Sequence, residues 1–270
     1  MIINSKFSSL YLGRKENWKA SFDQDVCYMQ RYAIREEIRI QFIGDSGGFV
    51  SKYISKSGDE VIVPVTALYL EPDIYGRVLY EIVFSVETAG LYSFMLTNEV
   101  DEVSTFFYIA QPEDLADTIL LNYTHRKNEY DTIFIDEDGV DKRFNFRVEG
   151  GFYPGDRVQA VENEIFRDQR FEPFQTAAES YEISALTIGT KRGVPQWVGN
   201  KINSIFKLSD ILIDGIETTR NESAIPELIK LGTYYPLYVF KMNVEQPDED
   251  RIYSGTSNRI HINAFNNKFN

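Results

Sequence analysis

The chain of 270 residues has few of the side chains on which disulfides, metal sites and acid–base catalysis depend. Its single cysteine, Cys27, cannot form an internal disulfide. It has only two histidines, His125 and His261, which leaves few combinations for metal coordination or for a histidine base. The sequence contains neither a P-loop nor a dinucleotide-binding glycine motif. We therefore expect a protein that is not an enzyme, with no catalytic, cofactor-binding or metal-binding residues.

Basic residues and long apolar runs are also scarce. There are 28 Lys and Arg against 41 Asp and Glu, a formal net charge of -13. This balance argues against non-specific binding of duplex DNA and against docking on an anionic membrane. No apolar run approaches the roughly 20 residues of a membrane span. The first residues lack the basic start and apolar stretch of a signal peptide, so we expect none.

Apolar and aromatic residues are plentiful enough for a folded, β-rich chain. Hydrophobic residues make up 43% of the sequence, which is sufficient for a buried core. The 17 Tyr and 19 Phe favour strands, where flat rings cover a pleated surface. We expect a mainly β protein of two domains.

Residues 1–112 carry the pattern of short strands. Ile38, Ile40 and Phe42 alternate with polar residues, and residues 78–86 alternate in the same way. A period of two is typical of a half-buried strand. Further strands are expected at 60–65, 91–96 and 104–110. Turn signals separate the strands, and their spacing predicts an immunoglobulin-like β-sandwich, although the Cys…Trp…Cys pattern of that family is missing.

A polar stretch at 111–117 predicts a linker to a second β-rich domain at 118–245. In that domain we expect a hairpin whose strands, 132–135 and 143–148, flank a tight turn at Asp138 and Gly139. Further strands are expected at 181–189, 210–217 and 235–245.

One amphipathic helix is expected near 195–207. Pro195 suits a first helical turn, and an apolar stripe follows it at helical spacing. Gly199 inside the helix weakens it by roughly 1 kcal/mol relative to Ala. Trp197 is predicted to anchor the stripe to the second sheet. The stripe consists of Trp197, Val198, Ile202, Ile205 and Phe206.

Residues 246–270 are expected to form an extended C-terminal arm that docks on a neighbouring subunit. The polar, proline-containing run 246–250 is how a linker begins. The apolar residues that follow are too widely spaced for a domain of their own. They are Ile252, Tyr253, Ile260, Ile262, Phe265 and Phe269.

Two short motifs invite a chemical interpretation that their context does not support. Residues 44–48, Gly-Asp-Ser-Gly-Gly, match the loop around a protease nucleophile, here Ser46. In that family the histidine base precedes the serine, whereas both histidines here follow it, so a glycine-rich turn is predicted. The acidic run 136–141 departs from the EF-hand spacing, and a solvated hairpin tip is predicted.

Two other classes of protein remain open at this point. Tyr69, Tyr75 and Tyr153 lie near turns and could stack on sugar rings, as in a β-sandwich adhesin or carbohydrate-binding module. A glycosidase or peptidase would need convergent carboxylates, or a base close to Ser46. A closed ring of copies would favour an assembly protein over both.

Five stretches resemble a family of structural tail proteins from tailed phages and prophages of Bacteroidetes, including crAss-like phages. They are LNYTHRKNEYDTIF, FNFRVEGGF, LTIGTKRGVPQWVGNKIN, ILIDGI and YYPLYVF, in this order, and the resemblance covers residues 25–245. It implies a non-enzymatic tail hub or baseplate subunit, made in the host cytoplasm and assembled into the virion.

The resemblance also implies partners. These are copies of the chain in a multi-copy ring and other tail or portal-proximal proteins, with no specific nucleic-acid binding and no membrane. The acidic surplus is expected to keep a surface near the DNA channel from holding phosphates, or simply to maintain solubility.

Overall fold

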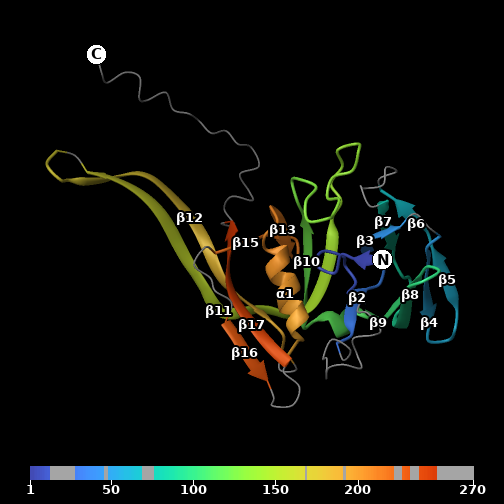
Figure 1. The fold of residues 1–270 in the computed structure, drawn as a ribbon. Helices are drawn as coiled ribbons and strands as arrows, with labels where there is room; N and C mark the ends of the chain where they lie inside the picture. Colours follow the sequence, from blue (N-terminus) through green and yellow to red (C-terminus); the bar gives the residue numbers. More distant parts are fainter. Residues whose placement is uncertain are drawn as a thin grey trace.

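The chain is mainly β, with one α-helix in the part that the structure describes (Figure 1). The computed structural model describes residues 1–12, 28–45, 48–68, 76–167, 169–190, 193–221, 227–231 and 237–247. Ser46, Tyr69, Tyr75 and residues 248–270 lie outside these ranges, and so do the predictions made for them. No helix among the described residues is long and apolar enough to cross a membrane.

Two sheets enclose the core of the first region. One has the order β1-β3-β7-β6 and the other the order β2-β9-β8-β4-β5. The strands are β1 (Ile2–Ile3), β2 (Gln30–Ala33), β3 (Ile38–Asp45), β4 (Val50–Ser55), β5 (Glu60–Val63), β6 (Val65–Ala67), β7 (Arg77–Phe84), β8 (Gly90–Thr97) and β9 (Glu102–Ala110). Ile38, Ile40 and Phe42 are fully buried between the sheets, so the predicted alternation in β3 is confirmed.

The prediction of a single strand at 60–65 is wrong. The chain forms β5 in one sheet and β6 in the other, with Pro64 between them. Proline has no N–H to donate to a ladder, so the chain can leave the first sheet at this point and cross to the second.

The second region is one large sheet with the order β14-β13-β10-β11-β12-β17-β15, and β16 also pairs with β17. A short 3-10 helix, Pro112–Leu115, connects it to β9. The strands are β10 (Thr118–Thr124), β11 (Phe144–Arg167), β12 (Pro173–Ile188), β13 (Asp210–Ile213), β14 (Ile216–Glu217), β15 (Thr219–Arg220), β16 (Glu227–Leu231) and β17 (Leu237–Pro247).

The prediction of a hairpin between strands 132–135 and 143–148 is also wrong. β11 pairs instead with β10, and Ile135 makes only an isolated bridge to Asp141. The side-chain oxygen of Asn128 accepts hydrogen bonds from the backbone N–H groups of Phe134 and Ile135, both at 2.8 Å. These donors are satisfied by a side chain, which competes with ladder pairing.

Helix α1 (Gln196–Ile205) confirms the predicted helix, and its apolar stripe packs on the large sheet. Trp197 is buried, and its ring stacks on Tyr11 with centroids 4.1 Å apart. Gly199 has a packing role, because a Cβ at this position would collide with the ring of Phe240 in β17. Glycine lowers the helix propensity at this position, but its lack of a Cβ allows Phe240 of β17 to pack directly against the helix.

The N-terminal segment links the two cores. Phe7 belongs to the core of the second region, whereas Leu10 belongs to that of the first. The ammonium group of Lys201 on α1 is buried against the backbone carbonyl oxygens of Ser5, at 3.1 Å, and Ser8. Residues that open the sequence therefore hold the two regions together.

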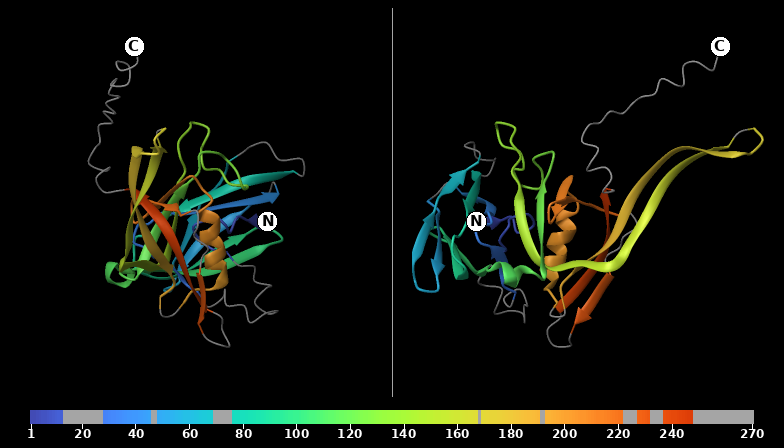
Figure 2. Two further views of the ribbon diagram at one scale, coloured as in Figure 1. Left: turned by 90° about the vertical axis from the view of Figure 1, so that its left-hand side faces the viewer. Right: turned by 180° about the vertical axis from the view of Figure 1, so that it is seen from behind.

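β11 and β12 extend far beyond the body of the molecule as a two-stranded hairpin (Figure 2). At Gly150 β11 passes close to β12, since a Cβ there would come 2.5 Å from the carbonyl oxygen of Thr187. A register shift follows between Phe152 and Arg157. Such irregularities bend a strand, and here β11 leaves the body after them.

Candidate functional site

One contact between the two regions is a buried polar cluster centred on Glu81 of β7. Its carboxylate accepts hydrogen bonds from Arg39 at 2.9 Å and from Lys142 of the second region at 2.9 Å. Gln41 donates to the same carboxylate at 2.8 Å and exchanges two further hydrogen bonds with the backbone of Ile133. Both oxygens of Glu81 are occupied, so the cluster joins the regions and offers no free base.

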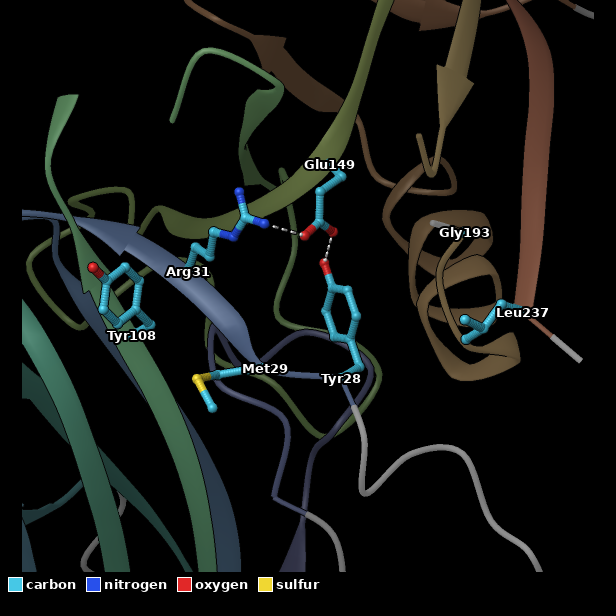
Figure 3. A pocket seen from close by; sticks show the side chains of 7 residues that line it. All are labelled: Tyr28, Met29, Arg31, Tyr108, Glu149, Gly193 and Leu237. Atoms are coloured by element: carbon cyan, nitrogen blue, oxygen red, sulfur yellow. Dashed lines mark hydrogen bonds and ion pairs between the residues drawn. The ribbon is translucent and has the colours of Figure 1, made fainter. Parts of the chain in front are cut away.

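A second polar cluster lines a cavity of about 400 Å³ (Figure 3). Glu149 of β11 lies between Arg31, at 3.2 Å, and the hydroxyl of Tyr28, which donates to it at 2.6 Å. Burial, and then the charge of Glu149, raise the pKa of Tyr28 well above its ordinary value, so the hydroxyl keeps its proton. Glu149 is bound by both Arg31 and Tyr28, which is consistent with a structural role for the three groups.

The acidic run at 136–141 is a turn that closes on itself. One carboxylate oxygen of Asp136 accepts hydrogen bonds from the backbone N–H groups of Asp138, at 3.1 Å, and Val140, at 2.8 Å. Residues 137–141 are exposed, which confirms the predicted solvated tip. Among the described residues, no group of three or more His, Cys, Asp or Glu could hold a metal ion.

His125 ties a loop to the start of β13. Its Nδ1 accepts a hydrogen bond from the backbone N–H of Ser209 at 3.1 Å, and the hydroxyl of Ser209 lies 3.2 Å from the same nitrogen. Its Nε2 lies 3.8 Å from the carboxylate of Glu129. The ring is half-buried, and its Nδ1 is held by Ser209. Of the protease motif, Asp45 ends β3, and Ser46 lies outside the described residues.

The surface that stands out is the projecting hairpin, defined here as residues 158–167 of β11, 173–180 of β12 and the tip between them. From the pair Val161–Ser180 to the pair Arg167–Pro173, each strand pairs only with the other among the described strands. Every side chain from 161 to 167 is exposed. Consecutive residues of a strand point to opposite faces, so both faces of the hairpin are open.

Apolar side chains are concentrated on this hairpin. Five of them are more than half exposed: Val158 (59%), Val161 (55%), Ile165 (58%), Phe166 (55%) and Phe171 (79%). An isolated two-stranded hairpin is marginally stable in water, and open edges invite another strand. The arrangement is therefore suited to contact with another protein surface.

Sequence reasoning missed this hairpin because it carries no alternating pattern. The run Val161-Glu162-Asn163-Glu164-Ile165-Phe166 has no period of two. Alternation appears when one face of a strand is buried and the other is wet, and here both faces are wet. Residues 157–167 contain neither Gly nor Pro, which is compatible with a continuous strand, but Pro154, Gly155 and Asp156 just before them are typical of a turn.

Comparison with known proteins adds no relative: no family model matches the chain, and no curated protein matches it.

Proposed function

We propose that this protein is a non-enzymatic structural subunit of a phage tail, at the hub or baseplate, where copies of it assemble into a ring. The observation that carries the proposal is the projecting hairpin, with its open edges and exposed apolar side chains. A monomer gains nothing from exposing Phe166 and Phe171 to water, since burying such a side chain contributes about 1.5–3 kcal/mol. Contact with a partner would recover that free energy.

Two further features support an assembly role. The polar clusters around Glu81 and Glu149 are saturated by their own partners and hold the two regions in one orientation. The five stretches that resemble Bacteroidetes phage tail proteins all lie in the second region, which carries the hairpin. The first region serves as an immunoglobulin-like sandwich that presents a surface to other tail or portal-proximal proteins.

The proposed location is the virion tail, close to the DNA channel but without specific binding to nucleic acid. The net charge of -13 supports this arrangement, because an acidic surface does not displace counterions from phosphates. Tight binding of duplex DNA at physiological salt, with a steep salt dependence, would contradict it.

Sedimentation velocity and negative-stain electron microscopy of the purified full chain test the proposal. We expect a closed ring in class averages, and disruption of it by the double substitution Val161→Glu and Phe166→Glu. Ile62→Glu is the matched control, since Ile62 is 75% exposed on β5, away from the hairpin. A chain that stays monomeric at high concentration and binds glycans would instead support an adhesin.

A further inference from the structure

The projecting hairpin has two open edges, one along β11 and one along β12. Only the β12 edge is on the side where the described chain ends. The sheet order β10-β11-β12-β17 places β17 on the β12 side. β17 runs antiparallel to β12 as far as Pro247, which pairs with Tyr181. This corrects the expected start of the C-terminal arm, because Gln246 is a buried residue of the strand. The last described residue therefore lies on the β12 side of the sheet.

The outer edge of β11 carries the groups that an added strand would contact. Beyond the stretch that pairs with β10, β11 has β12 as its only partner among the described strands. Val161, Ile165 and Phe166 are exposed on this strand, and so are Glu162 and Glu164. An added strand would place its side chains directly beside them.

The C-terminal residues have the complementary composition. Residues 252–270 contain no Asp or Glu, although the chain has 41 of them, and they include Arg259 and Lys268. Around Arg259 the sequence reads Asn-Arg-Ile-His-Ile-Asn-Ala, in which Ile260 and Ile262 alternate with polar or basic residues. This is the period-two pattern of a strand, and its basic residues are opposite in charge to Glu162 and Glu164 of β11.

We propose that residues 252–270 of one copy add a strand to the outer edge of β11 in the hairpin of a neighbouring copy. The described chain ends on the β12 side and the acceptor edge is on the β11 side, so each copy would donate a strand on one side and accept one on the other. Such a head-to-tail contact is heterologous and generates a ring when the rotation closes. The inference rests on the proposed function, because it names the contact through which the ring assembles.

Cysteine cross-linking between two versions of the full chain, both carrying Cys27→Ser, tests the contact. One version carries Asn163→Cys on β11, and the other carries Ser257→Cys and an affinity tag that changes its mass. A bismaleimide linker tolerates a small shift in register. We expect a mixed dimer of the two versions. In the matched control, Ser57→Cys replaces Asn163→Cys. Ser57 is an exposed serine between β4 and β5, and we expect no mixed dimer from this version.

Two outcomes would overturn the contact. One is a yield of mixed dimer no greater than that of the Ser57→Cys control. The other concerns a chain that carries both Asn163→Cys and Ser257→Cys. If this chain forms only intramolecular cross-links on dilution, the tail binds its own hairpin.

Deletion of residues 252–270 separates this inference from the proposed function. We expect the deletion to weaken self-association by roughly tenfold or more, about 1.4 kcal/mol per tenfold, and the melting temperature of the monomer to stay unchanged. Rings that form equally well without these residues would refute the tail–hairpin contact and leave the assembly role standing. A full chain that never self-associates would refute both.

Discussion

Replacement of Glu81 by Gln probes the contact between the two regions most directly. Glu81 is 6% exposed, and its carboxylate binds Arg39 and Lys142, each at 2.9 Å. Glutamine keeps the shape and removes the charge, so Lys142 loses the carboxylate that it binds and Arg39 keeps only its ion pair with the more exposed Glu37. Breaking a buried ion pair by neutralising one partner costs about 3–5 kcal/mol. We expect the free energy of unfolding to fall by about that amount at pH 7.

The pH dependence of stability gives the same substitution a second readout. Burial raises the pKa of Glu81, but the charge of Arg39 and the hydrogen bonds from Gln41 and Lys142 outweigh it and hold the pKa below its ordinary value. The stabilisation is therefore fully present above the ordinary pKa of a glutamate, about 4.3, and is lost as the pH falls through the lower, folded-state value. The Glu81→Gln variant should lack this component of acid destabilisation.

Urea unfolding followed by fluorescence at pH 7, and at several values down to pH 3, measures both effects. Glu87→Gln is the matched control, because Glu87 pairs with Arg35 on the surface, where both side chains are mostly exposed. An exposed pair contributes about 0–1 kcal/mol. If Glu81→Gln costs no more than Glu87→Gln, and both show the acid profile of the parent, the cluster does not hold the regions together.

Four further substitutions test the core around α1. Trp197→Ala should lower the free energy of unfolding by about 3–5 kcal/mol, since it removes a large buried ring; a variant that melts like the parent would contradict the packing. Gly199→Ala should destabilise in spite of better helix propensity, because overpacking against Phe240 costs about 1–3 kcal/mol. Adding Phe240→Leu should restore part of the loss in thermal unfolding. Burial lowers the pKa of Lys201 from 10.5 to about 7, so the unfolded chain binds the extra proton between these values and stability should rise with pH across them. Lys201→Met should remove this rise in denaturation measured from pH 7 to 10, and an unchanged slope would refute the assignment.

The sequence alone determined the elements whose environment is local or repeats regularly. The period of two in β3 and β7, and the apolar stripe of α1, each predicted an element that the structure contains. These patterns are legible because one face of each element packs on its own sheet or core. The turn at Asp138 was equally predictable, because it is closed by the side chain of Asp136, which lies close to it in the sequence.

Only the tertiary structure decided which polar faces are buried and which apolar ones are exposed. Gln41 and Glu81 occupy the outward positions of their strands, and they are buried because the second region covers them. The side chain of Asn128 accepts hydrogen bonds from the backbone N–H groups of residues 134 and 135, an interaction that strand periodicity does not encode. In the projecting hairpin, both faces meet water in the single chain, so no burial pattern marks it. The physical reason is common to all three: burial and pairing across distant segments depend on which surfaces meet, and strand periodicity reports only the contrast between the two faces of one strand.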